Sequence, residues 1–499
     1  MLKRTPLEEG SLPLLSTAGL AFCWIVARAC IQSITIDEAD TYLAYVRPAR
    51  PTYWEAAANN HVLNSLLMRL STSLLGVSNF SLRLPAVLGA ALYITAAYVL
   101  VRLMTRSLPL AWGLLVCLVS NPFVMDYLVA ARGYSLALAF LMAALAYAAW
   151  RESSGADPLR TCAVCSAAIA LSFAANFSFA IADAVTLAGI ALWCASGKRS
   201  IRHYARIAAA AIVPGLLVAL YLTGAILAHW PRNEFRWGAT TFQWSMQTIG
   251  EQSFHKLSPY LVPEPPYEFL LRHRHLLLPL LGLACLWRLI VLVRTRPAEP
   301  DGSRAWLVRL GLVTGAGVVL AVALHGVLVA AFHMLWPRGR TGLFVPPLAI
   351  LAVGALASIP CVSKMGIASR RVITALVAAI GCYFILCLRL TWFDEWYWNA
   401  GSDRLYHVVA YYNHTYGVRQ IGTNWRYVAV LEFQRVLSEH ETLEPVALER
   451  PIPGGRSLYV LFPADDDAFM RQQGLKLVYH DPLSDAMVAI RPELEVRVH

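Results

Sequence analysis

Two adjacent carboxylates, Asp37 and Glu38, follow directly after a long apolar stretch, in the segment SITIDEADTYLAYV (residues 33–46). Ionisable side chains at membrane depth cost roughly 2.5–3.5 kcal/mol each on insertion scales, so they mark substrate sites, ion paths or paired structural charges. Further ionisable residues are predicted to lie with this pair at one face of a membrane: His61, Arg83, Asp126, Arg132, Arg338 and Arg340.

This set of residues combines a few acids with several arginines, which leaves positive charge available for an anion. A planar guanidinium group suits two oxygens of a phosphate, and a carboxylate can accept the proton of an attacking hydroxyl group. The set therefore predicts transfer from a lipid phosphate donor, whose phosphate is a good leaving group that cations can stabilise. The predicted catalytic residues are Asp37, Glu38 and Asp126, and the residues predicted to bind the donor phosphate are His61, Arg83, Arg132, Arg338 and Arg340. We expect Asp37 to be the base, because a carboxylate partly shielded at the membrane edge binds a proton more readily than one in water.

A structural role for these charges is the alternative. In that case Asp126 pairs with Arg132, and the acidic pair binds Arg28 or Arg83, so that the charges only hold helices together. The sequence assigns no definite cofactor. If a divalent cation takes part, its expected ligands are Asp37, Glu38 and Asp126.

The elements that must position these residues are membrane helices. The 499-residue chain is 58% hydrophobic and only 15% charged, which is too apolar for a soluble protein of this length. Its formal net charge of +11 does not indicate nucleic-acid binding, because no basic-aromatic module or zinc-finger spacing accompanies it. The lysines and arginines fall mainly in short gaps between apolar stretches, which is typical of a polytopic membrane protein.

About eleven stretches reach the ~20 apolar residues that a membrane span requires. The apolar stretch around Asn176 is too long for one helix without a large tilt, so AANFSF predicts a hairpin of two short helices. The predicted spans cover residues 12–31, 82–101, 108–128, 133–150, 161–175, 178–195, 207–229, 275–293, 309–333, 341–360 and 372–392.

The distribution of basic residues predicts the orientation. With a cytoplasmic N-terminus and an uncleaved first span, the inner segments hold most of the lysines and arginines, including those at 369–371. We therefore expect a multi-pass protein of the cell (inner) membrane, with Asp37, the loop 230–274 and the C-terminal domain outside the cytoplasm.

Two outer loops, 32–81 and 230–274, have patterns of their own. The segment NNHVLNSLLMRLSTSLLG (59–76) alternates polar and leucine positions at helical spacing, which predicts an amphipathic helix in the interface. The loop 230–274 is rich in aromatic residues and proline, which favours a lid along the membrane surface.

The composition changes to that of a soluble domain after TWFDEWYWNA (391–400). We expect a transmembrane catalytic domain over 1–393 and an α/β cap domain over 394–499. Strands are predicted at 457–462, 476–480 and 487–490, with helices near 405–412, 426–438 and 466–473. The acids Asp465 to Asp467 at the start of the last helix favour helix capping over a metal site.

Three motifs resemble the GT-C class of glycosyltransferases that use polyprenyl-phosphate sugars: DEADTYL, the segment from NNHVL to RLPAVLGA, and ARGYSLAL. The resemblance is nearest to the protein O-mannosyltransferases and to the bacterial transferases that modify lipid A with aminoarabinose. It covers the order of elements over nearly the whole chain, and its specific motifs lie at about residues 35–140 and in PRGRTGLFVPPLAIL.

The resemblance implies a fold, a reaction and roles for individual residues. Asp37 matches the first-loop aspartate that acts as catalytic base in the class, and Glu38 matches its acidic neighbour. His61 stands where the class often has His-Pro-Pro-Leu, although Val62 and Leu63 replace the prolines here. Arg83 matches an Arg-Leu-Pro motif, and Asp126 lies near the second acidic site. Inverting transfer is expected.

The expected partners are a polyprenyl-phosphate sugar donor, a lipid, protein or polysaccharide acceptor, and membrane lipids. A secondary transporter or flippase for an anionic or lipid-linked substrate is the main rival. Transporters place their charges near the bilayer midplane in repeated halves, whereas this sequence shows no repeat and groups its charges at one face.

Overall fold

The computed structural model describes residues 11–48, 57, 59–155, 157–196, 200–231, 237–295, 302–438 and 442–495. Within them, ten helices are long and apolar enough to cross a membrane, or eleven if one bent pair counts as a single span. All eleven predicted spans overlap these helices, so the prediction of a polytopic α-helical membrane protein is confirmed. The helices of the spans are α1 (Ser11–Ile31), α4 (Asn79–Met104), α5 (Leu108–Ser120) with α6 (Pro122–Val129), α7 (Tyr134–Ser153), α8 (Pro158–Ala175), α9 (Ala180–Cys194), α10 (Ile201–Leu227), α13 (Leu277–Arg294), α14 (Gly302–Gly311) with α15 (Gly317–Phe332), α16 (Val345–Ser358) and α17 (Lys364–Leu386).

Short local signals end and begin these helices. Asn176 separates α8 from the 3₁₀ turn Phe177–Phe179 and from α9, as the predicted hairpin requires, and its Oδ1 accepts a hydrogen bond from the Ser178 N–H at 3.0 Å. The predicted span 108–128 is instead bent by 53° between α5 and α6. Asn121 caps α6 by accepting bonds from the N–H groups of Phe123 and Val124, and Pro122 follows at the first helical position, where its missing N–H is not needed.

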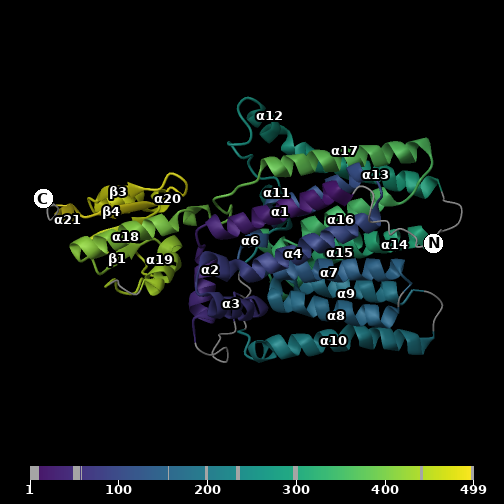
Figure 1. Cartoon of the computed structure of the whole chain (residues 1–499), viewed down its shortest axis with the longest axis horizontal. Helices are drawn as coiled ribbons and strands as arrows, with labels where there is room; N and C mark the ends of the chain where they lie inside the picture. Colours follow the sequence, from purple (N-terminus) through teal and green to yellow (C-terminus); the bar gives the residue numbers. More distant parts are fainter. Residues whose placement is uncertain are drawn as a thin grey trace. The chain divides into compact units, whose positions relative to one another are not determined.

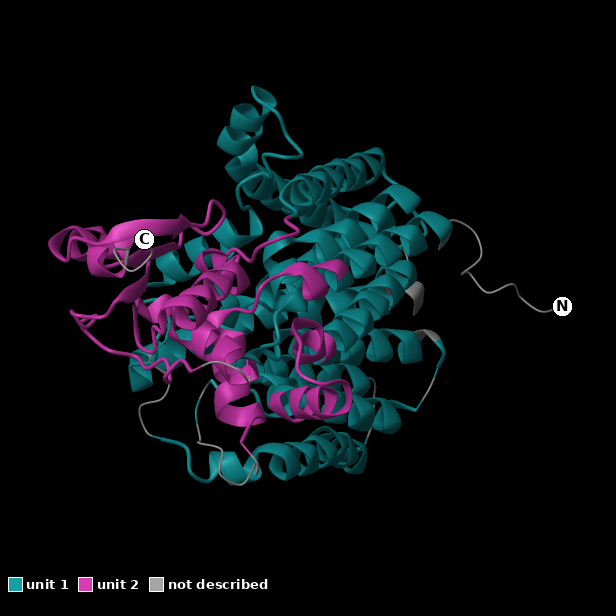
Figure 2. Cartoon of the chain, turned by 60° about the vertical axis from the view of Figure 1, so that its left-hand side comes forward, with its two compact units in different colours: residues 1–26, 55–64, 85–388 teal, residues 27–54, 65–84, 389–499 magenta. Residues whose placement is uncertain are grey.

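The chain forms two compact units that do not follow the linear sequence (Figure 2). Unit 1 comprises residues 1–26, 55–64 and 85–388, and unit 2 comprises 27–54, 65–84 and 389–499. In unit 1, α7, α8, α9 and α10 lie side by side with nearly parallel axes (Figure 1). The loop predicted as a lid contains α11 (Phe242–Ser253) and α12 (Pro266–His273), and its residues 232–236 lie outside the described part.

The helix predicted for the first outer loop is α3 (Val62–Leu75), and its polar side faces the protein. Asn64 and Ser65 are buried, whereas Leu70 and Leu74 are 54% and 72% exposed. A helix with its leucines outward suits contact with lipid.

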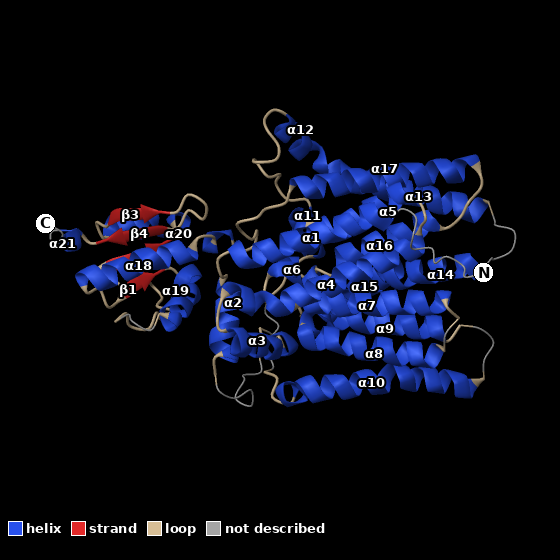
Figure 3. Ribbon diagram, viewed as in Figure 1, coloured by secondary structure: helices blue, strands red, loops and turns tan. Residues whose placement is uncertain are grey.

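The C-terminal part of unit 2 is a small α/β domain (Figure 3). Its sheet has the order β1-β2-β4-β3, with β1 (Ile421–Thr423) parallel to β2 (Leu458–Leu461) and with β4 (Met487–Ile490) antiparallel to both β2 and β3 (Lys476–His480). The helices are α18 (Ser402–Tyr416), α19 (Trp425–Leu437), α20 (Pro463–Gln472) and α21 (Pro492–Glu495). Three strands and three helices were predicted here, whereas the three-residue β1 was not.

Candidate functional site

The carboxylate pair lies on the short helix α2 (Ile36–Thr41), which continues into a π-helical turn at Tyr42–Val46. Thr35 caps α2: its Oγ1 accepts a bond from the Glu38 N–H, and Glu38 Oε2 accepts one from the Thr35 N–H at 3.0 Å. This reciprocal capping box fixes the first turn of the helix. The helix α19 packs against α2. Just after α2, the ring of Tyr42 meets the ring of Phe433 edge to face, with 5.2 Å between the ring centroids.

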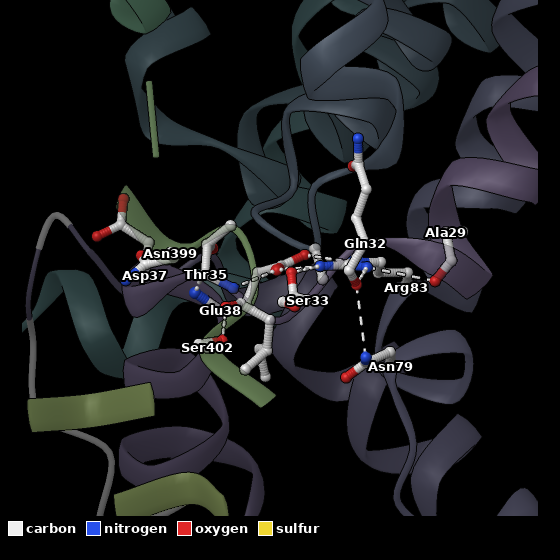
Figure 4. Close-up of polar contacts among 12 residues, drawn as sticks. Ala29, Gln32, Ser33, Thr35, Asp37, Glu38, Asn79, Arg83, Asn399 and Ser402 are labelled. Carbon is white, nitrogen blue, oxygen red and sulfur yellow. Dashed lines mark hydrogen bonds and ion pairs between the residues drawn. The ribbon is translucent and has the colours of Figure 1, made fainter. Parts of the chain in front are cut away.

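Glu38 forms a fully buried ion pair with Arg83 of α4 (Figure 4). The Arg83 Nε and Nη2 atoms donate to the two Glu38 carboxylate oxygens at 2.8 and 2.7 Å, and both side chains are 1% exposed. The guanidinium group also donates to the backbone oxygens of Gln32 at 2.6 Å, Ser33 at 2.8 Å and Ala29 at 3.3 Å. Arg83 thus joins the end of α1, the loop to α2 and Glu38.

This arrangement gives Arg83 an internal role. The sequence pattern predicts that Arg83 binds the donor phosphate, whereas in the structure its N–H groups donate to Glu38 and to three backbone oxygens. The ion pair of Glu38 with Arg83 is the one expected if these charges only hold helices together. The guanidinium groups of Arg83 and Arg28 both lie over the ring of Phe393. The Cζ atom of each is 5.2 Å from the ring centroid.

Asp37 is the neighbour of Glu38 on α2 and is partly exposed. In Figure 4 its carboxyl group points away from the Arg83 side chain. The segment that carries it is held by residues from the far end of the chain: the Ile36 N–H donates to Asn399 Oδ1 at 2.8 Å, and Ser402 Oγ donates to the Ile34 oxygen at 3.3 Å. Sequence reasoning missed Asn399 and Ser402, because nothing in their local pattern links them to residue 36.

Unit 1 contains a cavity of about 480 Å³ that gathers three of the other predicted residues, His61, Arg132 and Arg340. Its walls are aromatic and polar, a composition typical of ligand pockets of this size. Residues not singled out from the sequence also line it: Tyr134, Asn176, Trp237, His325 and Trp336.

His61 is 3% exposed, and neither of its ring nitrogens has a hydrogen-bond partner among the described residues. A buried polar group without a partner is costly, so the ring nitrogens of His61 are suited to a ligand that would complete their hydrogen bonds. Burial, reinforced by the charges of Arg132 and Arg340, holds the pKa of His61 well below its usual 6.5. The ring is therefore neutral at pH 7 and offers one N–H donor and one acceptor.

The two arginines of the cavity are positioned by different segments. Arg132 is 1% exposed, follows α6, and donates to the side chain of Asn59. Arg340 lies over the ring of Trp237 at 5.3 Å. Arg338 packs against Trp237 and Trp244, each at 4.7 Å, and is not among the described residues that line the cavity.

The loop that carries Arg338 and Arg340 is tied to the predicted lid segment. Ala239 and Trp336 exchange two backbone hydrogen bonds at 2.8 and 2.9 Å, and Ser245 Oγ donates to the Pro337 oxygen at 2.5 Å. Gly339 has a φ of +47°, which lets the chain turn between the two arginines.

Gly133 fixes the approach of the α6–α7 turn to the cavity. It has a φ of +73°, and a Cβ atom there would lie 2.1 Å from the Ala175 oxygen and 3.1 Å from the His61 Cβ. Only glycine fits between Arg132 and Tyr134 without displacing these groups.

Asp126 is buried in α6, all of whose residues are buried, and is not among the described residues that line the cavity. Asp37, Glu38 and Arg83 belong to unit 2, whereas His61, Asp126, Arg132, Arg338 and Arg340 belong to unit 1. Among the described residues, no group of three or more His, Cys, Asp or Glu side chains is placed to hold a metal ion.

The overall fold is similar to that of a solved structure. The chain has a GT-C-like fold, that of membrane glycosyltransferases. The crystal structure of ArnT from Cupriavidus metallidurans bound to undecaprenyl phosphate aligns with it at a TM-score of 0.52 and 11% identity, covering 97% of this chain and 98% of that one.

Two further solved structures align less well. The apo state of the same ArnT aligns at a TM-score of 0.45 and 14% identity, over 97% of this chain and 98% of that one. The arabinofuranosyltransferase AftD from Mycobacteria gives 0.47 and 16%, over 96% of this chain and 41% of that one. Because both scores lie below 0.5, the fold assignment rests on the first comparison. No protein-family model matches the chain, and no curated protein sequence is significantly similar to it.

We expect Glu38→Gln to destabilise the full-length protein by about 3 kcal/mol, because it leaves the Arg83 guanidinium buried without its counter-charge. The measurement is chemical unfolding in detergent. The matched control is Glu152→Gln, which breaks an ion pair with Arg309 whose side chains are 38% and 32% exposed and should cost less than about 1 kcal/mol. Equal effects of the two substitutions would contradict a structural role for the buried pair.

We expect Gly133→Ala to lower stability by more than the ~1–2 kcal/mol that positive φ alone costs a residue with a Cβ. The extra loss comes from the clash with the Ala175 oxygen. Gly155→Ala is the control, since Gly155 has a φ of +69° but open space around its Cβ position. Thermal unfolding midpoints of the two variants separate the contributions, and indistinguishable midpoints would show that the turn can relax.

Proposed function

We propose that the protein transfers a sugar from a polyprenyl-phosphate donor to an acceptor hydroxyl group at the outer face of the cell membrane. The observation that carries the proposal is the unit 1 cavity, in which His61 lies beside Arg132 and Arg340 and has no hydrogen-bond partner in the described part of the chain. A cavity with two guanidinium groups and a neutral imidazole donor suits a phosphate group. The undecaprenyl phosphate in the ArnT structure supports the same class of ligand.

In this proposal each group has one task. Arg132, Arg340 and His61 hold the donor phosphate and stabilise its charge as it leaves. The acceptor hydroxyl group attacks the anomeric carbon, its proton passes to the Asp37 carboxylate, and the bond from carbon to the phosphate oxygen breaks with inversion. The aromatic walls formed by Trp237, Trp336 and Tyr134 offer apolar faces to the sugar.

Glu38, Arg83, Asn399 and Ser402 are positioning residues in the proposal. They fix the capped turn of α2, so that the Asp37 side chain starts from a rigid backbone. Asp126 remains a predicted catalytic residue, and Arg338 a predicted phosphate contact.

We expect Asp37→Asn to lower kcat for sugar transfer by about 10²–10⁴-fold with little change in unfolding midpoint, because the amide cannot accept the hydroxyl proton. The assay uses purified protein in detergent with labelled polyprenyl-phosphate sugars, where no sealed compartment exists and a transporter would give no product. Asp40→Asn, an exposed position on the same helix, is the control. Activity of the Asp37 variant within tenfold of the native protein would remove Asp37 from the role of base.

We expect Arg340→Gln and His61→Ala to raise KM for the donor by about tenfold or more, since each removes a contact to the leaving phosphate. Arg338→Gln, which removes a predicted phosphate contact that lies outside the described cavity lining, should raise KM by a smaller factor, about threefold. Donor titrations of the three variants test this. An unchanged KM in the first two would contradict phosphate binding in the cavity, whatever the outcome for Asp37.

A further inference from the structure

A second cavity of unit 1, with a volume of about 320 Å³, is separate from the residues used above. It is lined by side chains of α5, α11, α13, α16 and α17, and its size falls in the ~300–1,000 Å³ range of ligand pockets. Almost all of the lining is apolar, which excludes a sugar or a free phosphate from its interior.

The lining residues form strips along the membrane helices. On α16 they recur at one-, three- and four-residue spacing, and on α17 at three- and four-residue spacing, so each set lies on one helical face. The strips extend over about two turns, or roughly 10–12 Å along the helix axes. Such a slot suits an alkyl chain that runs parallel to the helices. The strips consist of Val345, Pro346, Ala349, Ile350 and Val353 on α16, and of Val377, Ile380 and Phe384 on α17.

One polar side chain in the lining, that of Ser253, has no hydrogen-bond partner within the described ranges. Ser253, at the end of α11, is 5% exposed, and its hydroxyl group makes no hydrogen bond with the described residues. A buried hydroxyl group without a partner is unfavourable, which indicates that a ligand acceptor atom completes the site.

Arg274 lies near this cavity, outside its described lining. It precedes α13 by one turn and is four residues before Leu278 of the lining. Its guanidinium group is close enough to Tyr383 to interact with it electrostatically, and the Tyr383 ring centroid lies 5.8 Å from that of Phe254, another lining residue. One terminal nitrogen of Arg274 is buried without a hydrogen-bond partner among the described residues.

The surroundings of Arg274 carry both signs of charge. Exposed Lys256, Arg272, His273 and His275 lie on the same segment, together with the acids Glu264 and Glu268. The 18 residues of α13 span roughly 27 Å, close to the ~30 Å of a bilayer core. Arg274 therefore lies at the level of lipid headgroups, while the slot extends into the hydrocarbon.

We propose that this cavity binds one acyl chain of an anionic bilayer phospholipid, with the lipid phosphate on Arg274 and an ester carbonyl on the Ser253 hydroxyl group. The ester contact favours a phospholipid over a polyprenyl phosphate, which has a phosphate and an alkyl chain but no carbonyl group. The site stands apart from the transfer reaction, so it can fail or hold independently of the proposed function.

Native mass spectrometry of the full-length protein tests the proposal with two probes, phosphatidylglycerol with ester-linked chains and its ether-linked analogue. The native protein is expected to bind the ester lipid about three- to tenfold more tightly, as one hydrogen bond would give. Ser253→Ala should abolish that difference. Arg274→Gln should weaken binding of both lipids by about tenfold, whereas Arg294→Gln at the opposite end of α13 should not.

The apolar slot is tested by filling it. Ala349→Trp should weaken lipid binding by tenfold or more, and Leu283→Trp, at a position of α13 that is 64% exposed and outside the lining, should leave it unchanged. If Ala349→Trp does not fold, photo-crosslinking with a diazirine-bearing phosphatidylglycerol replaces it, with labelled peptides expected in α16 and α17.

Equal binding of ester and ether lipids to the native protein would overturn the proposal. Loss of the phosphatidylglycerol label from the α16 and α17 peptides when an equimolar amount of undecaprenyl phosphate is present would also overturn it.

Discussion

The buried ion pair between Arg83 and Glu38 is the constraint on which the architecture of unit 2 depends. Two fully desolvated charges are tolerated only when every donor and acceptor is used, and here the guanidinium group satisfies a carboxylate and three backbone oxygens at once. Glu38 in turn closes the capping box of α2. The same residue thus neutralises a buried charge and fixes the turn that presents Asp37, which explains why two acids stand side by side in the sequence although only one is proposed to do chemistry.

In the unit 1 cavity, unlike in this ion pair, a buried polar group is available for a ligand. Its central polar residue, His61, has no hydrogen-bond partner among the described residues, while burial, reinforced by two arginines, keeps its ring neutral. A binding site gains affinity when its polar groups are held in place and have no competing partner within the protein. Gly133, the Asn176 turn and the bridge between Ala239 and Trp336 supply that rigidity, because each allows an approach that a bulkier or more flexible segment would prevent.

Much of the fold could be predicted from local patterns. The eleven apolar stretches, the break at Asn176 and the strands of the C-terminal domain depend on length, periodicity and turn residues, all of which act within a few positions. The bend at Asn121 and Pro122 carried a local signal as well, but 108–128 is also long and apolar enough to be taken as one straight span. The strand β1 was missed because three residues are too few to show alternation.

The amino-acid sequence is enough to identify which residues are expensive to bury and the spans from which they project, since hydrophobicity and charge are properties of each residue. What those residues contact depends on how the helices pack in three dimensions. Arg83 pairs with Glu38, which is 45 residues away in the sequence, and Ile36 hydrogen-bonds with Asn399, which is 363 residues away. His61, Arg132 and Arg340 line one cavity. Contacts at such separations leave no periodicity in the chain, because they arise from the packing of whole helices rather than from any local preference.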